Sequence, residues 1–134
     1  MKINIVKTLI KLAKYNKKGY PFSACIQYKG KTYFAVNEVI FKNDPTAHAE
    51  IQVIKKICQK EKTIDLKKAK IYCSGEPCGM CLYAMAWANI KQIYYINNYK
   101  IAQQQGYKYD NNAKKLNKVQ NLQLKITKLS ERTR

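Results

Sequence analysis

One histidine and two cysteines are spaced in a way that suits a zinc ion. His48 is followed 30 residues later by Cys78 and then by Cys81, as a Cys-x-x-Cys pair. Two cysteines at this spacing can present both sulfurs on one side of a single helical turn. Three protein ligands leave the fourth position of tetrahedral zinc open for water, and an open position is typical of catalytic rather than structural zinc. The spacing therefore predicts a catalytic zinc site with His48, Cys78 and Cys81 as ligands.

Glu50 is placed to move protons at this site. It lies two residues after His48, close enough to reach a water on the metal without being a ligand itself. Zinc lowers the pKa of such a water from near 16 to about 7. Glu50 is predicted to take the proton and to return it to a ring nitrogen and then to a leaving amine. The pattern His-x-Glu followed by Pro-Cys-x-x-Cys, which residues 48–50 and 77–81 match, is typical of zinc deaminases.

The chain is strongly basic, with a formal net charge of +18 over 134 residues. Such a charge favours polyanions, so RNA, including tRNA, is one candidate partner for the lysine-rich surface. Only Arg132 and Arg134 are arginines, however, and lysine recognises phosphates and bases less specifically than arginine does. Lysine, asparagine, isoleucine and tyrosine are frequent along the whole chain, so a general composition bias explains the charge equally well.

Several features predict a protein of the reducing cytoplasm. No run of eighteen apolar residues is present, so no membrane-spanning helix is expected. Lysines interrupt residues 1–14, which lack both the apolar core of a signal peptide and the arginines of a mitochondrial presequence. Cys25, Cys58 and Cys73 lie in apolar stretches and are expected to be buried thiols rather than disulfides.

Hydrophobic periodicity predicts a single α/β domain over residues 1–134. After a first amphipathic helix, residues 22–40 are predicted to form a hairpin that turns at Lys29–Lys31. Asp44 as N-cap and Pro45 as first residue predict a helix that carries His48 and runs to about Gln59. The remaining predicted elements are a strand at 69–74, a helix at 78–88, a strand at 90–96, a partly helical region at 99–118 and a last strand at 122–126. Helices between strands imply parallel pairs after the hairpin, hence a three-layer α/β/α sandwich.

These motifs resemble the cytidine-deaminase-like superfamily, most closely the small bacterial guanine deaminases and next the tRNA adenosine deaminases. Residues 43–50, Asn-Asp-Pro-Thr-Ala-His-Ala-Glu, are similar to the guanine-deaminase motif almost letter for letter. Residues 21–24, Pro-Phe-Ser-Ala, and 85–88, Met-Ala-Trp-Ala, resemble further guanine-deaminase segments, whereas residues 76–81 resemble both groups. The similarity covers about residues 5–110. It implies zinc as cofactor, a five-stranded mixed sheet and a homodimer, sometimes with an exchanged C-terminal segment.

The resemblance also implies residues that bind the substrate. Asn37 lies where relatives use an asparagine to hydrogen-bond the base, although it could instead be a turn residue that ends a strand. Trp87 either lines the base pocket or packs in the core. The other residues implied are Ala49, Tyr107 and Asp110.

The C-terminal part departs from the guanine-deaminase pattern. Asp110 is displaced by one residue from the acid that follows the Gly-aromatic pair, and the tail is shortened, with Glu131 as its remaining candidate acid. Three interpretations stay open: a deaminase of a free nucleobase or nucleoside, with guanine preferred; a tRNA adenosine deaminase; and a catalytically inactive zinc-bound homologue.

Overall fold

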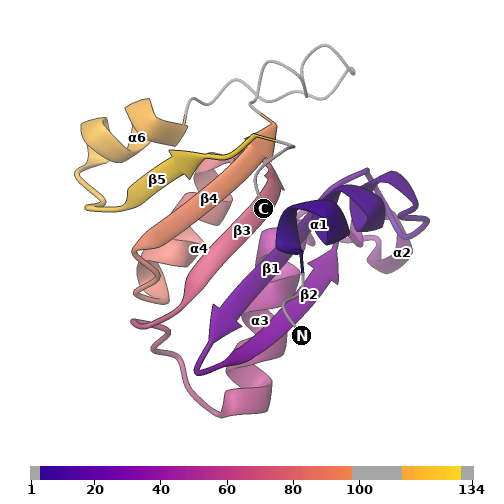
Figure 1. Cartoon of the computed structure of the whole chain (residues 1–134), viewed down its shortest axis with the longest axis horizontal. Helices are drawn as coiled ribbons and strands as arrows, with labels where there is room; N and C mark the ends of the chain where they lie inside the picture. The colour runs from indigo at the N-terminus through magenta and orange to yellow at the C-terminus, as the bar shows by residue number, and fades with distance from the viewer. Residues whose placement is uncertain (1–3, 98–112, 131–134) are drawn as a thin grey trace.

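A five-stranded mixed sheet forms the centre of the chain (Figure 1). The computed structural model describes residues 4–97 and 113–130. The strands lie in the order β2-β1-β3-β4-β5. Their bounds are Ser23–Tyr28 for β1, Lys31–Val36 for β2, Lys70–Gly75 for β3, Gln92–Asn97 for β4 and Lys125–Lys128 for β5. β1 is antiparallel to β2 and β3, whereas β3, β4 and β5 are parallel.

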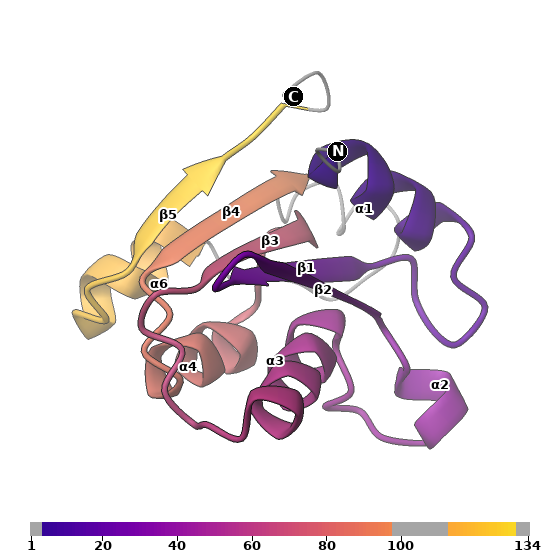
Figure 2. The same ribbon diagram turned by 60° about the horizontal axis from the view of Figure 1, so that its bottom comes forward.

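Helices cover both faces of this sheet, which confirms the predicted three-layer α/β/α sandwich (Figure 2). α1 (Ile5–Lys14) packs on β1 and β3 from one side, while α3 (Ala49–Glu61) and α4 (Gly79–Trp87) cover the other. α6 (Ala113–Gln120) contacts α4. The larger apolar core lies under α3 and α4 and includes Val53, Ile57, Ile71, Leu82 and Ile93. In the described part of the chain no helix is both long and apolar enough to span a bilayer.

The hairpin of β1 and β2 turns where the sequence predicts. Lys29 and Gly30 both have positive φ, 49° and 76°, as the two-residue turn of a right-twisted hairpin requires. β2 is the edge strand of the sheet, and the Lys56 side chain donates to the carbonyl of Phe34 at 3.0 Å. This contact places a charged side chain from α3 against the edge strand.

The predicted start of the helix after the hairpin is wrong. Asp44 is not its N-cap, because the Asp44 carboxylate accepts from the backbone N–H of Thr46 at 2.8 Å and from the Thr46 hydroxyl at 2.6 Å, which closes a local turn. The helix begins four residues later than predicted, at Ala49, with His48 as N-cap in an extended conformation. A one-turn helix that the sequence pattern did not predict, α2 (Val39–Lys42), occupies the end of the predicted hairpin.

The last strand also lies further along the chain than predicted. β5 covers residues 125–128, whereas the alternation of apolar residues predicted 122–126. Asn117 on α6 explains the difference, since its side chain accepts from the Leu124 N–H at 3.0 Å and donates to the Leu124 carbonyl at 2.7 Å. These bonds hold Leu124 to α6, so its backbone is not available to the sheet. Residues 98–112, most of the predicted partly helical region, lie outside the described residues.

Candidate zinc centre

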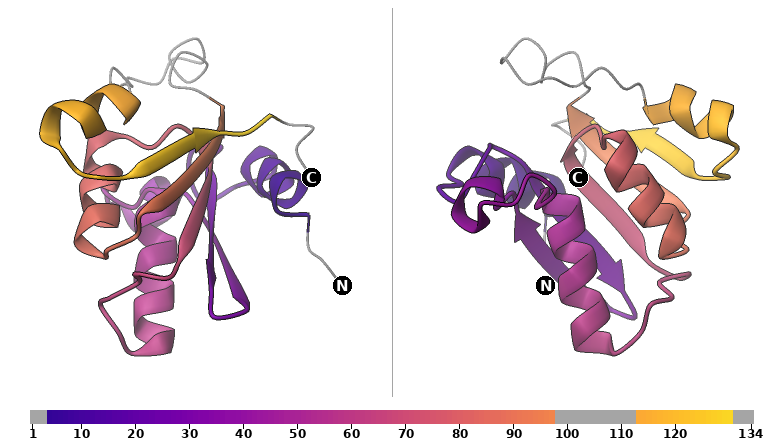
Figure 3. Two further views of the ribbon diagram at one scale, coloured as in Figure 1. Left: turned by 60° about the vertical axis from the view of Figure 1, so that its left-hand side comes forward. Right: turned by 180° about the vertical axis from the view of Figure 1, so that it is seen from behind.

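Two neighbouring helices bring the predicted ligands together. His48 is the N-cap of α3, Cys78 is the N-cap of α4, and Cys81 lies in the first turn of α4. α3 and α4 lie side by side on one face of the sheet, as the view from behind in Figure 3 shows. Unpaired backbone N–H groups and the positive end of the helix dipole favour negative charge at such positions, including the thiolate form of cysteine.

The distances from the histidine nitrogen to the two sulfurs fit a tetrahedral zinc site. The His48 Nδ1 atom lies 3.6 Å from the Cys78 sulfur and 3.7 Å from the Cys81 sulfur, and all three atoms lie within 4.8 Å of one another. Zinc–nitrogen and zinc–sulfur bonds of ordinary length at a tetrahedral angle place N and S about 3.6 Å apart. One imidazole and two thiols are also the donor types that zinc prefers. His48, Cys78 and Cys81 therefore form a candidate zinc site.

The two thiols of this site differ in acidity. The Cys81 thiol and the His48 ring, both against the Cys78 sulfur, lower the pKa of Cys78 to about 4 despite its burial. The same contact raises the pKa of Cys81 well above the usual value, and burial raises it further. The neighbouring Cys78 also raises the pKa of His48. One thiolate is thus available before a metal binds, and binding through both sulfurs must release a proton from Cys81.

Glu50 is a buried carboxyl group beside these ligands. Its side chain faces away from solvent, with 7% of the residue exposed, and it follows His48 by two residues in the first turn of α3. Burial raises the pKa of Glu50 to about 7; Cys78 raises it further and His48 lowers it. A carboxyl group with a pKa near neutrality can both accept and return a proton at pH 7, which is the requirement for general acid–base chemistry.

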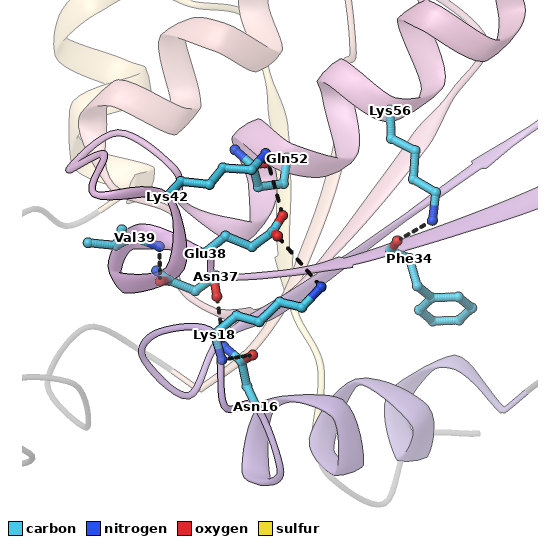
Figure 4. Close-up of polar contacts among 9 residues, drawn as sticks. All are labelled: Asn16, Lys18, Phe34, Asn37, Glu38, Val39, Lys42, Gln52 and Lys56. Atoms are coloured by element: carbon cyan, nitrogen blue, oxygen red, sulfur yellow. Dashed lines mark hydrogen bonds and ion pairs between the residues drawn. The ribbon is translucent and has the colours of Figure 1, made fainter.

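Asn37 is buried in a loop that its own side chain holds in place (Figure 4). Its Oδ1 atom accepts from the backbone N–H groups of Tyr20 at 3.2 Å and Val39 at 3.0 Å. Its carbonyl accepts from the Asn16 side chain at 2.8 Å. Asn37 therefore organises the turn after β2, as one of the two sequence interpretations predicts. The Nδ2 donor is not used in these bonds, and its role toward a substrate stays a prediction.

Of the other predicted substrate-binding residues, one is buried, one is exposed, and two lie outside the described residues. Ala49 is fully buried between His48 and Glu50. The alternative that Trp87 packs in the core is wrong, because this residue is 83% exposed at the end of α4. Its role in a base pocket stays a prediction. Tyr107 and Asp110, like Glu131, lie outside the described residues.

Sequence reasoning missed the structural role of Glu76. This residue is buried, and its carboxylate accepts from the backbone N–H of Ala113 at 2.6 Å, at the start of α6. Its own N–H donates to the Asn97 carbonyl at 2.7 Å. Glu76 thus ties the loop before Cys78 both to β4 and to α6. In the sequence, only the position of this acidic residue directly before Pro77 and Cys78 indicated such a role. That position does not reveal that its carboxylate binds the N–H of Ala113.

Comparison with known proteins identifies the family. Residues 2–97 match the family described as "Cytidine and deoxycytidylate deaminase zinc-binding region". Since the match covers more than half of the chain, the protein belongs to this zinc-binding deaminase family.

Individual relatives point to two kinds of deaminase. The chain is 39% identical over 90 residues to a guanine deaminase of Bacillus subtilis, covering 66% of this chain and 58% of that protein. It is 36% identical over 80 residues to a tRNA-specific adenosine deaminase of Aquifex aeolicus, covering 59% of this chain and 53% of that protein. The X-ray structure of the Bacillus subtilis guanine deaminase superposes with a TM-score of 0.75 at 35% identity, covering 80% of this chain and 71% of that one. The matched region thus spans little more than half the length of these two curated relatives.

Proposed function

We propose that residues 1–134 act as one zinc-dependent hydrolytic deaminase domain. The reaction replaces an exocyclic amine of a nucleobase with oxygen and releases ammonia, and the preferred substrate is guanine, which becomes xanthine. The observation that carries the proposal is the clustering of the His48, Cys78 and Cys81 ligand atoms, with the buried carboxyl of Glu50 two residues from the histidine. The similarity to the Bacillus subtilis guanine deaminase supports guanine as the base.

The chain's own residues divide the work between binding the metal and moving protons. His48, Cys78 and Cys81 would hold zinc, which supplies Lewis-acid activation of a water molecule. Glu50 accepts a proton from that water, donates it to the ring nitrogen next to the reacting carbon, and then assists the loss of the amine as ammonia. Because Glu50 is shielded from solvent, the proton it holds stays close to the reacting base.

The substrate base would be held by the loop after β2 and by the chain around α4. Two backbone N–H groups fix the Asn37 side chain through Oδ1, which leaves the Nδ2 group as the donor for an acceptor atom on the base. Ala49 borders the pocket through its backbone between His48 and Glu50. The remaining contacts are proposed for Trp87, Tyr107 and Asp110.

A second candidate substrate is adenosine in the anticodon loop of a tRNA. Two observations favour it: the net charge of +18 and the similarity to the tRNA-specific adenosine deaminase of Aquifex aeolicus. A flipped-out nucleotide needs an open pocket and a surface that attracts the phosphate backbone. Ammonia release from guanine compared with release from an anticodon stem-loop separates the two candidates.

We further propose that the protein works as a cytoplasmic homodimer. Met80, Tyr83 and Trp87 are exposed large apolar residues, and their spacing of three and four places them on one face of α4. A second copy of the chain would cover this face. None of the five cysteines forms a disulfide, which suits a reducing compartment. Light scattering on the zinc-loaded protein should give the mass of a dimer, and Trp87→Glu should shift it to the monomer. A monomeric parent protein would contradict this proposal.

The proposed activity is tested by ammonia release from zinc-loaded protein. The substrates are guanine, guanosine, adenine, cytosine, cytidine and an anticodon stem-loop, and Glu50→Gln is the matched control, since it keeps the size of the side chain and removes its proton transfer. Turnover of guanine that the control loses would support the proposal. Turnover of the stem-loop alone would favour the tRNA candidate. Full zinc content without turnover of any substrate would support the inactive homologue.

A further inference from the structure

A groove of about 750 Å³ lies beside the edge strand of the sheet, away from the zinc ligands. We call it the β2–α3 groove. α3 lines it on one side of β2 and Leu12 of α1 on the other, while the chain after α1 contributes Lys18 and α2 contributes Lys42 (Figure 4). Apolar side chains, among them Leu12, Phe34 and Val36, contribute to its lining, whereas none of the zinc ligands and not Glu50 line it. Its volume is in the range of pockets that hold small organic molecules.

The rim of the β2–α3 groove is strongly positive. It carries five lysines and one glutamate, a formal charge of +4. The glutamate, Glu38, is already paired with Lys18 at 3.7 Å and Lys42 at 3.6 Å. Lys55 and Lys60 have no ion pair with any residue of the described ranges, and both are exposed on the groove side of α3. The groove therefore has a net positive charge that its own glutamate does not cancel.

A buried amide in the same groove lacks a hydrogen-bond acceptor. Gln52, only 6% exposed, accepts from the Lys42 ammonium through Oε1 at 2.6 Å. Because an ammonium can only donate, this bond fixes the orientation of the amide and makes Nε2 the remaining donor. Nε2 is buried and has no hydrogen-bond partner among the described residues. Buried donors are rarely left unpaired, so this one indicates a ligand that supplies an acceptor oxygen.

We propose that the β2–α3 groove binds a phosphorylated small molecule. Its phosphate oxygens contact Lys55 and Lys60 and accept from the Nε2 group of Gln52, while its uncharged part lies along β2 beside Ala35. On α3, Lys55 follows Gln52 by three residues, and Lys60 follows Lys55 by five. All three residues line the groove, so one ligand with two or three phosphates can reach them. A concave site with a buried donor suits a bounded ligand better than a nucleic acid backbone, which would need an open, continuous track.

Calorimetric titration of the zinc-loaded protein with sodium tripolyphosphate, ATP and AMP at physiological salt tests this proposal. We expect one molecule to bind per chain. Lys55→Glu/Lys60→Glu should weaken the binding at least about tenfold, because charge-assisted hydrogen bonds are lost. The matched control is Lys114→Glu/Lys118→Glu, which makes the same change of charge at exposed lysines of α6 and should alter the affinity by less than about twofold, as expected for a change in distant, screened charge.

Gln52→Leu tests the contribution of the buried amide to binding separately from that of the positive charge. This change removes the unpaired donor together with the acceptor of the Lys42 hydrogen bond, and it substitutes an apolar side chain of similar volume. Lys42 stays paired with Glu38, so the fold should be about as resistant to heat as the parent protein. The affinity for tripolyphosphate should nevertheless fall. Equal affinity for tripolyphosphate and ATP would mean that only the phosphates are recognised, and tighter binding of ATP would mean that the base also contributes.

Three results would overturn the proposal. One is the absence of one-to-one binding for all three phosphates. Another is an equal loss of phosphate affinity in Lys55→Glu/Lys60→Glu and in Lys114→Glu/Lys118→Glu, because the binding would then depend on the total charge of the protein. The third is an RNA oligonucleotide whose binding depends on Lys55 and Lys60 while the small phosphates do not bind, which would make the groove a nucleic acid surface.

Discussion

Replacement of Gly19 by alanine should disturb the Asn37 loop much more than its size suggests. A Cβ atom at Gly19 would lie 2.3 Å from Asn37 Oδ1 and 2.8 Å from the Asn37 carbonyl oxygen, both far inside contact distance. The first of these oxygens accepts from two backbone N–H groups and the second accepts from the Asn16 side chain. The Asn37 loop must therefore move, and these three hydrogen bonds are the ones at risk.

The size of the effect follows from those bonds. Three hydrogen bonds at about 1 kcal/mol each amount to roughly 3 kcal/mol, and the lower entropy of alanine in the unfolded chain offsets about 0.5–1 kcal/mol. Gly19→Ala should thus lower the free energy of unfolding by about 2 kcal/mol. Gly30→Ala is the matched control, since a Cβ there meets nothing within 4 Å and only its positive φ of 76° opposes the change. The left-handed conformation costs a residue with a Cβ about 1–2 kcal/mol, and the lower entropy of the unfolded chain offsets part of this, so the net cost should be about 1 kcal/mol.

Urea denaturation of both variants measures the difference, and steady-state kinetics with guanine measures its consequence. If Asn37 contacts the base, Gly19→Ala should lower kcat/KM, whereas Gly30→Ala, in the turn between β1 and β2, should leave it unchanged. Similar stability for the two variants would refute the predicted clash. A destabilised Gly19→Ala with normal kcat/KM would show that the loop is structural and that Asn37 does not bind substrate.

Three further predictions concern the buried acid and the thiols. Glu50→Gln should lower kcat by about 10²–10⁴, as expected for loss of a general acid–base group, while elemental analysis should still find zinc; unchanged kcat would exclude the proposed role. Cys81→Ser should reduce the zinc content of purified protein, and activity should fall in proportion to the metal lost, because a hydroxyl is a poorer zinc ligand than a thiolate. Burial raises the pKa of Cys25 to about 12, above the value of 9.0 for a free thiol, so its neutral form contributes stability that is present below pH 9 and lost as pH rises toward 12. Denaturation between pH 8 and pH 11 should therefore show a smaller loss of stability in Cys25→Ala than in the parent chain, and parallel curves would contradict this.

The order of helices and strands was largely predictable because the patterns behind it are local. The turn at Lys29 and Gly30 and the start of α4 after Cys78 both follow from residues within a few positions. The last strand was misplaced because the bonds between Asn117 and Leu124 come from a different element, which no periodicity reveals. The same reason hid the contact of Glu76 with α6 and the groove around Gln52, since each depends on segments that the fold brings together.

The misplaced start of α3 has a different cause, and it connects the fold with the site. Asp44 is a better N-cap by residue type than His48, yet His48 is the N-cap of α3. Neither His48 nor Cys78, the N-cap of α4, makes a side-chain capping hydrogen bond. Both side chains instead point to the candidate metal site, which gives up a stabilisation of roughly 1 kcal/mol for each helix. Violations of local rules are expected where function requires them. Two helices that lack side-chain caps and meet at three zinc-type ligands are thus an argument for metal binding that is independent of the sequence motif.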